Sequence, residues 1–370
     1  MQWNGVKLMK NKKNNYVKRD FISKIDAEYI IIMGQRTNGK SFAVKEDIIK
    51  RALENEEEFA YIRRYKEDCK QYMISEYFSD IICDKNGNNH LLEWSNGKYN
   101  DIVCREQSIY FAFTDEDGKT TRGQKFGRMF GLSWATHYKS LSFPKMTTAV
   151  YEEFITDECF LSDEVRRFMN LISTIFREKK ARVYLVGNTL SRINPFFNEW
   201  ELVNIPKQKI NSVEIYKHKY TDENDEPQEC RIAVYLTHST KVNSGMFFGN
   251  IGKSITSTMW ETDEHPHLRG KRSDYETIYT MVFMYDKTLF LMELLKDTNN
   301  YTWFVSPKNT PPQKNTRIVS NKYFHSPLWT DDFSPISDGE RLPFEWLRSG
   351  RICFSDNLTG TEFYQCYHML

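Results

Sequence analysis

Short apolar runs alternate with amphipathic stretches along the first 200 residues. Residues 29–33 carry no charged side chain, a pattern typical of a strand buried on both faces of a parallel sheet. Residues 41–53 instead place apolar side chains at helical spacing with charges between them, which predicts an amphipathic helix. The same reasoning predicts strands at 58–62, 148–151 and 183–186, and a long helix that ends at Arg177. This alternation predicts an α/β domain with a mainly parallel central sheet.

The pattern changes between residues 80 and 130, which are rich in Gly, Asn and Asp. Turn signals at 85–88 and 115–118 predict hairpins there, so we expect a β insertion in a first domain over residues 1–240. Gly, Ser and charged residues then dominate 241–272, which we expect to be a linker.

Closely spaced strand patterns follow the linker, at 278–285, 289–295 and 301–305. Beyond Ser306 the chain is rich in proline, which predicts loops. We therefore expect a smaller, β-rich C-terminal domain over residues 273–370.

Composition narrows the function classes. The 370 residues carry a net charge of +1, so a polyanion partner would have to contact local basic patches. The basic residues of the first 24 positions are typical of a solvated leader.

The seven cysteines are scattered and form no Cys-x-x-Cys motif. This pattern argues against a disulfide framework or a zinc site and for a reducing cytoplasm. No apolar run is long enough to span a membrane, so we expect no membrane partner.

The segment after the first strand has the G-x-x-x-x-G-K-S pattern of a phosphate-binding loop. Its backbone N–H groups can close around phosphate oxygens at the start of the following helix. We predict that Lys40 reaches the β- and γ-phosphates of ATP and that Ser41 ligates Mg²⁺. The predicted nucleotide-binding residues are Gly34, Gln35, Arg36, Thr37, Asn38, Gly39, Lys40 and Ser41.

Two acids end the strand predicted at 148–151. A phosphate-binding loop needs one acid to hold Mg²⁺ and often a second to polarise the attacking water. Glu152 fits the first role and Glu153 the second, although the usual metal-side residue is Asp. The alternative is a charged strand end without a catalytic role.

Two polar residues further along the chain have open interpretations. Arg177 is either a cation that stabilises a helix C-terminus or an arginine finger that reaches a neighbouring subunit's γ-phosphate. Asn188, at the tip of the next strand, is either a γ-phosphate sensor or a turn residue. A third segment, 249–254, ends in Gly-Lys-Ser but lacks the first glycine and the leading strand, so we interpret it as a loop.

Four basic residues are candidates for contact with DNA or with another subunit, although solvated surface is the default interpretation for each. Arg63, Arg64 and Lys66 follow a predicted strand on the nucleotide side, and Lys139 precedes the acidic strand. Together they could line a channel that holds a phosphate backbone without reading its sequence.

Rival classes of phosphate-binding-loop protein fit less well. A GTPase would carry an N-K-x-D motif, which is absent, and a small-molecule kinase usually lacks paired acids. An additional-strand ATPase with a catalytic glutamate fits better.

Five segments carry a more specific resemblance: 32–43, 59–66, 148–155, 170–177 and 187–197. In order and spacing they resemble the DNA-packaging ATPases of small phi29-like tailed phages, over about residues 28–200. The resemblance implies that Lys40 and Ser41 hold nucleotide and metal, that Glu153 is the catalytic acid and that Arg177 is a trans-acting finger. It also implies that Lys139 signals between subunits. Glu152 departs from the family's Asp.

The resemblance further implies a ring of subunits, expected to be a pentamer, that docks on the portal of a prohead in the host-cell cytoplasm. The ring would translocate double-stranded DNA inward, and a packaging RNA is a further candidate partner. The C-terminal domain would be a vestigial RNase H-like nuclease. Three alternatives remain: a large terminase with an active nuclease, a helicase-like DNA remodeller, and a slow or inert nucleotide-binding scaffold.

Overall fold

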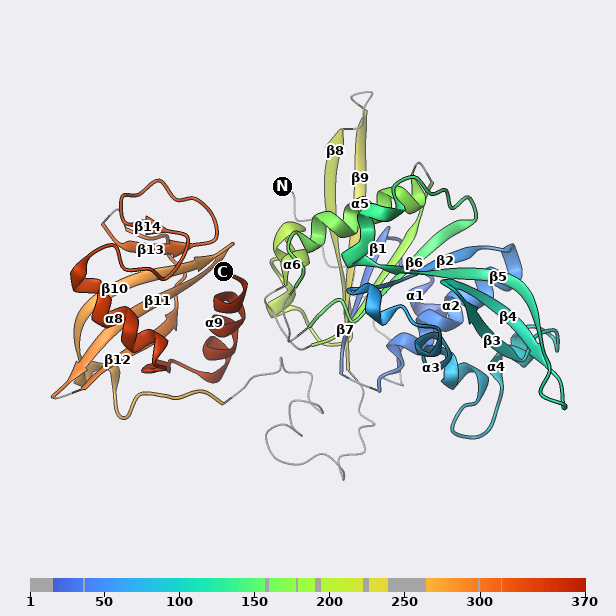
Figure 1. Ribbon diagram of the computed structural model, residues 1–370, viewed down its shortest axis with the longest axis horizontal. Helices are drawn as coiled ribbons and strands as arrows, with labels where there is room; N and C mark the ends of the chain where they lie inside the picture. Colours follow the sequence, from blue (N-terminus) through green and yellow to red (C-terminus); the bar gives the residue numbers. More distant parts are fainter. Residues whose placement is uncertain are drawn as a thin grey trace. The chain divides into compact units, whose positions relative to one another are not determined.

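The chain folds into two compact units (Figure 1). The structure is a computed structural model. It describes residues 16–35, 37–156, 160–177, 179–189, 194–221, 226–238, 264–298, 300–313 and 315–370, without the Pro206 side chain. The described part of the first unit comprises residues within 16–156, 160–189 and 202–238, and that of the second comprises 194–201 and 264–370. Among these residues no helix is long and apolar enough to cross a membrane.

Strands and helices alternate in the first half of the first unit, as the apolar pattern predicts. The elements up to the acid pair are β1 (Tyr29–Gly34), α2 (Lys40–Asn55), β2 (Glu58–Arg63), α3 (Gln71–Ile82), α4 (His90–Trp94), β3 (Asp101–Arg105), β4 (Ser108–Thr114), β5 (Thr120–Gly131) and β6 (Met146–Glu152), preceded by the short α1 (Arg19–Ile22). The 3₁₀ turns η1 (Lys66–Asp68) and η2 (Leu132–Tyr138) follow β2 and β5. The remaining elements are α5 (Glu164–Phe176), β7 (Arg182–Asn188), η3 (Ile205–Lys207), β8 (Ser212–Thr221) and β9 (Pro227–Thr237).

The strands of the first unit form one sheet in the order β3-β4-β5-β2-β6-β7-β1-β9-β8. The central neighbours from β5 to β9 pair in parallel, which confirms the predicted α/β fold with a mainly parallel sheet. Strand β7 lies between β1 and β6, the order expected of an additional-strand ATPase domain. The carboxyl ends of β1, β6 and β7 therefore meet at one edge of the sheet. Ligands of open α/β sheets bind at such an edge.

Both faces of the central strands are buried. Ile30 and Ile32 of β1 join the core formed with α2 and α3, whereas Ile31 points to the other face and is equally buried. On that other face the Tyr151 ring of β6 stacks on Phe168 of α5. Helix α5 and helices α1–α3 lie on opposite sides of these strands (Figure 1). Strands buried on both sides explain why the sequence shows unbroken apolar runs there.

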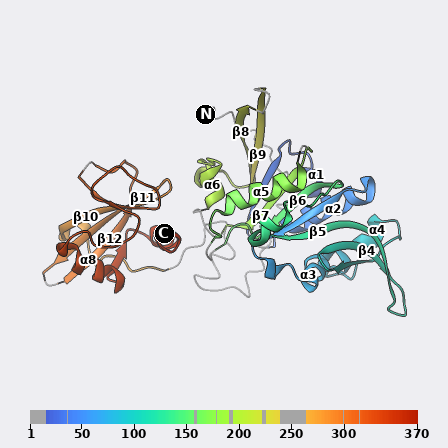
Figure 2. The same ribbon diagram turned by 45° about the horizontal axis from the view of Figure 1, so that its top comes forward.

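The predicted β insertion is only partly correct. Residues 108–131 form the β4–β5 hairpin, and the 115–118 turn joins its strands as predicted. The 85–88 turn instead joins helices α3 and α4, because the Asp84 carboxylate accepts the N–H groups of Asn86 and Asn88 and closes the loop by itself. At the opposite edge, β8 and β9 pair over their whole length and project past the neighbouring strands (Figures 1 and 2).

The second unit contains a sheet in the order β14-β13-β10-β11-β12-β15. Strands β10, β11 and β12 are antiparallel neighbours, and β13 pairs in parallel with β10. The described elements of this unit are α6 (Pro195–Glu199), η4 (Arg272–Asp274), β10 (Glu276–Tyr285), β11 (Thr288–Asp297), β12 (Asn300–Pro307), β13 (Arg317–Ser320), β14 (Trp329–Thr330), α8 (Asp338–Arg348), β15 (Ile352–Phe354) and α9 (Asn357–Met369).

Two expectations for this part of the chain need correction. The tail after Ser306 does not consist of loops alone, because α8 and α9 pack Phe344 and Phe363 into a core around Trp303. Within the expected linker, residues 241–263 lie outside the described residues, and so does the Gly-Lys-Ser segment. The described residues 264–272 are attached to the second unit, since His265 packs against Phe354 and Tyr364.

Candidate active site

The phosphate-binding loop connects β1 to α2 at the carboxyl edge of the first unit's sheet, as predicted. Gly34 has φ +152° and Gly39 has φ +82°, conformations that L side chains rarely adopt. A Cβ at Gly34 would also lie 2.2 Å from the carbonyl oxygen of Thr237 on β9. Both glycines are therefore required by the backbone path. Arg36 lies outside the described residues.

Lys40 is the centre of the loop's hydrogen bonds. Its buried ammonium donates to the carbonyl oxygens of Gly34, at 3.0 Å, and of Gln35. It also donates to the side-chain oxygens of Asn38, at 3.1 Å, and Asn188, at 3.3 Å. The structure thus brings Asn188, from the tip of β7, to the lysine that would contact the β- and γ-phosphates.

The Glu152 carboxylate lies between Ser41 and Tyr77. Tyr77 donates a hydrogen bond to one oxygen at 2.9 Å, and the Ser41 hydroxyl lies 3.5 Å from the other. Burial raises the pKa of Glu152, although the hydrogen bonds from Tyr77 and Ser41 and the nearby Lys45 ammonium oppose that effect. The Tyr77 contact gives the longer Glu152 side chain a defined position next to Ser41. Ser41 and Glu152 are therefore placed to hold Mg²⁺ with the phosphates and water.

Glu153 occupies a left-handed backbone conformation with φ +56°, immediately after β6. Its side chain is 66% exposed and forms an ion pair with Arg63 of β2 at 2.6 Å. Both side chains lie at the carboxyl edge, next to the loop. Arg63 is thus paired with the predicted catalytic acid.

The expectation that Arg64 contacts DNA or another subunit is wrong, because its side chain is buried inside the first unit. Two of its nitrogens donate to both oxygens of Glu164, at 2.9 and 3.1 Å. One of these two, Nη2, also donates to the backbone carbonyl of Phe154, and the third nitrogen, Nη1, donates to that of Glu153. Side chains alternate across a strand, so Arg63 and Arg64 point to opposite sides. Arg64 holds the backbone that positions Glu153.

A cavity of about 420 Å³ brings the predicted residues together. Its lining includes Thr37, Asn38, Gly39, Lys40, Ser41, Glu152, Glu153 and Asn188. Backbone N–H groups at a helix start, one lysine, one hydroxyl and two carboxylates are what a Mg²⁺-bound triphosphate requires. The residues present therefore fit ATP and Mg²⁺.

Arg177 and Lys139 do not line this cavity. Helix α5 leads from the carboxyl end of β6 back to the amino end of β7, and Arg177 is its C-cap. The exposed Arg177 side chain donates to the carbonyl of Leu141, in the segment between the exposed Lys139 and β6. Arg177 thus lies at the amino edge, opposite Lys40 of its own subunit, and Lys139 belongs to the segment that connects η2 to β6. The Lys66 side chain lies over the Trp134 ring, next to β2.

Three site residues were not found from the sequence. Tyr77 donates a hydrogen bond to Glu152, and the positive charge of Lys45 acts on the same carboxylate. The Lys45 ammonium lies 4.5 Å from the centre of the Tyr77 ring. The Thr237 hydroxyl donates a hydrogen bond to the Met33 carbonyl and accepts one from the Asn38 side-chain amide. These contacts join segments that are up to 204 residues apart, so no local pattern marks them.

Residues 6–100 and 120–323 match the profile of the podovirus DNA encapsidation protein (Gp16) family. The matched ranges cover more than half of the chain and include the loop, both acids and Arg177. The chain belongs to this family. Membership of the Gp16 family confirms the resemblance to phage DNA-packaging proteins.

Two "DNA packaging proteins" of Bacillus phages are similar to this Gp16-family chain. The phage B103 protein is 32% identical over 191 residues, which cover 50% of this chain and 51% of that protein. The phage PZA protein is 25% identical over 293 residues, 78% of each chain. The B103 match thus spans about half the length of that relative.

Among solved structures, the Gp16-family chain is similar to a chain of "the bacteriophage Phi-29 viral genome packaging motor assembly". The TM-score is 0.54 with 20% sequence identity, over 96% of this chain and 99% of the other. A likeness at this level of identity shows a shared fold.

Proposed function

We propose that this protein is an ATPase that hydrolyses Mg²⁺-bound ATP to translocate double-stranded viral DNA into a prohead. The observation that carries the proposal is that Lys40, Ser41, Glu152, Glu153 and Asn188 line one and the same cavity. The same chain belongs to a DNA encapsidation family, which supports DNA as the polymer that is moved.

Each side chain has a separate role in hydrolysis. The loop N–H groups and Lys40 bind the β- and γ-phosphates, and Asn188 contacts the γ-phosphate through its amide. Ser41 and Glu152 would hold Mg²⁺, which when bound would supply positive charge to offset that of the phosphates. Glu153 leaves its ion pair with Arg63 to orient water in line with the γ-phosphate, and the buried Arg64 fixes the backbone from which it does so.

Arg177 completes the site of a neighbouring subunit in a ring, which we expect to be a pentamer. The support is its position at the amino edge, where it is exposed and remote by topology from Lys40 of its own subunit. A trans-acting arginine of this kind contributes about 10³–10⁵-fold to turnover. Lys139, which is exposed, would transmit the state of one subunit to the next.

DNA, portal and any packaging RNA are contacted by surfaces outside the catalytic cavity, with Arg63 and Lys66 as candidate DNA contacts. We propose that the motor acts transiently on the prohead in the host-cell cytoplasm. The second unit is proposed to be a vestigial RNase H-like domain. Its strand order supports this, with an antiparallel β10-β11-β12 set extended by parallel β13 and β14.

The decisive experiment is steady-state ATP hydrolysis by the full chain, assembled on proheads, with and without duplex DNA. We expect DNA-dependent turnover that Lys40→Ala abolishes. Turnover that is negligible with DNA and proheads present would favour the inert scaffold. Metal-dependent nicking of DNA by the same preparation would favour a terminase with an active nuclease. Strand separation without packaging would favour a helicase-like remodeller.

A further inference from the structure

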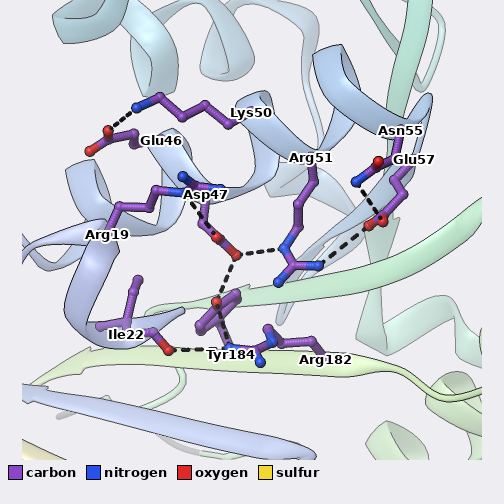
Figure 3. Close-up of polar contacts among 10 residues, drawn as sticks. All are labelled: Arg19, Ile22, Glu46, Asp47, Lys50, Arg51, Asn55, Glu57, Arg182 and Tyr184. Carbon is purple, nitrogen blue, oxygen red and sulfur yellow. Dashed lines mark hydrogen bonds and ion pairs between the residues drawn. The ribbon is translucent and has the colours of Figure 1, made fainter. Parts of the chain in front are cut away.

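An acidic side chain on the helix that follows the phosphate-binding loop has no part in the hydrolysis described above. This residue, Asp47 of α2, is fully buried (Figure 3). Its carboxylate accepts hydrogen bonds from Arg19 at 3.3 Å, from Arg51 at 2.8 Å and from the Tyr184 hydroxyl at 2.8 Å. A carboxylate removed from water is stable only when cations and hydrogen-bond donors surround it. Asp47 is therefore the point at which polar contacts join α1, α2 and β7.

The Tyr184 hydroxyl links α2 to β7. Burial, together with the nearby Asp47 carboxylate, raises the pKa of Tyr184 above its ordinary value, so the hydroxyl keeps its proton and donates the hydrogen bond. Tyr184 and Val186 of β7 also belong to the same buried core as Val44 and Ile48 of α2. Apolar contacts carry no direction, whereas a hydrogen bond fixes the distance between two groups. The Asp47–Tyr184 bond therefore sets the position of the helix along the strand.

A second polar link joins the same two elements at the phosphate-binding loop. There the Lys40 ammonium donates to the Asn188 side chain at 3.3 Å. Lys40 and Asp47 lie on one face of α2, two turns and about 10 Å apart. Tyr184 and Asn188 point to the same side of β7, with about 13 Å between them. The helix therefore runs antiparallel to the strand, with two polar links about two helical turns apart.

We propose that Asp47 and Tyr184 are positioning residues that make the site selective for ATP over ADP. This inference rests on the proposed hydrolysis of ATP at the loop. Lys40 and Asn188 both contact the γ-phosphate in that proposal, one from α2 and the other from β7. If the helix shifted along the strand, these two groups would no longer match the γ-phosphate, whereas the loop N–H groups around the α- and β-phosphates would move together. ADP has no γ-phosphate, so its binding would change less than that of ATP.

The two arginines hold the Asp47 carboxylate independently of Tyr184. Arg51 lies one turn along α2, and Arg19 belongs to α1. In Tyr184→Phe the carboxylate would keep both cations, so no unpaired charge would be left in the core. The phenylalanine ring would also fill the space of the tyrosine ring. This substitution therefore removes the hydrogen bond between α2 and β7 and little else.

The test measures the binding of two ligands to the full chain by calorimetry: Mg²⁺-ATPγS, which is hydrolysed slowly, and Mg²⁺-ADP. We expect Tyr184→Phe to weaken ATPγS binding about tenfold and ADP binding by less than about twofold, because only ATPγS reaches both Lys40 and Asn188 with a γ-phosphate group. ATP turnover on proheads should also fall about tenfold. Asp47→Asn should change the selectivity in the same direction, because a neutral amide holds the hydroxyl and the two arginines less strongly.

Tyr216→Phe is the matched control. Tyr216 of β8 is buried in the same sheet and donates to the Glu214 carboxylate at 3.3 Å, but neither residue lies on α2 or β7. Its substitution should leave turnover and the affinity for both ligands unchanged. Equal weakening of both ligands by Tyr184→Phe, or no weakening of ATPγS binding, would overturn the positioning role.

Lys40→Ala separates this failure from a failure of the proposed function, since it should weaken the binding of both ligands. If Lys40→Ala weakens neither, the nucleotide does not bind at the loop, and the proposed function fails together with this inference. If Lys40→Ala weakens both but Tyr184→Phe has no selective effect, the proposed function stands and only the positioning role is wrong.

Discussion

The two units differ in where their acidic side chains lie. In the first unit, Glu152 and Glu153 meet Lys40 at one edge, because three parallel strands end there and leave a cavity. In the second unit, two acids of the β10–β11 hairpin are each paired with a separate cation. Glu293 binds Arg272, and Asp286 binds Lys322. Within the described residues no group of three or more His, Cys, Asp or Glu could hold a metal ion.

The difference teaches that sheet geometry, rather than the number of acids, creates a reactive edge. In a parallel sheet the carboxyl ends of all strands, and the loops that follow them, lie at the same edge. In an antiparallel sheet the carboxyl ends of neighbouring strands lie at opposite edges. Catalysis should therefore be sensitive to changes in the first unit and insensitive to changes of acids in the second.

The largest effect is expected for Arg177. Arg177→Ala should lower turnover by assembled rings about 10³–10⁵-fold and spare ATP binding, because the finger would act on a neighbour's γ-phosphate. The measurement is ATP hydrolysis on proheads, with Arg166→Ala as a control at an exposed position of the same helix. Mixing Arg177→Ala with Lys40→Ala subunits should restore part of the activity. Without such restoration, the trans role is wrong.

A somewhat smaller effect is expected for Glu153. Glu153→Gln should reduce turnover about 10²–10⁴-fold and leave Mg²⁺-ATP binding intact, because the amide cannot accept the water's proton. Single-turnover hydrolysis and calorimetry measure the two properties separately. Glu54→Gln, an exposed acid near the far end of α2, should change neither. Turnover near that of the unchanged protein would exclude Glu153 as the general base.

The third prediction concerns Arg64, whose buried ion pair with Glu164 supports the backbone at Glu153. Arg64→Met should destabilise the first unit by about 3–5 kcal/mol, because Glu164, whose side chain is fully buried, would remain without its cation. Chemical unfolding of the full chain measures this, and the exposed Arg105→Met is the control. The double variant Arg64→Met/Glu164→Leu should recover part of the loss. A loss below about 1 kcal/mol would mean that the pair is not a support.

The smallest effect is expected in the second unit, at Asp286. Burial would raise the pKa of Asp286, but hydrogen bonds from Asn321, Lys322 and Asn198 outweigh it and lower the pKa below 3.8. Its contribution to stability is therefore complete above the ordinary pKa and is lost as the pH falls through the lower, folded value.

Asp286→Asn should accordingly cost about 0.2–1 kcal/mol at pH 7 and flatten the stability of the second unit below about pH 4. Unfolding curves of the full chain at pH 7 and pH 3 provide the measurement. ATP turnover should not change. A large loss of turnover would contradict the expectation that acids of the second unit have no part in catalysis.

The sequence by itself determined three features: the phosphate-binding loop, the strands at 29–33, 58–62, 148–151 and 183–186, and the position of the two acids directly after the third of these strands. Each depends on neighbouring residues, since apolar runs, glycines and acids at a strand end act within a few positions. Family membership could also be predicted, because several such segments keep their order and spacing.

Tertiary structure decided the rest. The sequence pattern does not distinguish Arg63 from Arg64. In the structure, side chains alternate at the end of β2, so Arg63 pairs with Glu153 and Arg64 is buried against Glu164. Tyr77 and Thr237 contact Glu152 and Asn38 from segments whose local patterns are ordinary. Their roles arise only when the sheet brings distant chain ends together, because a contact between remote residues leaves no periodic signal in either segment.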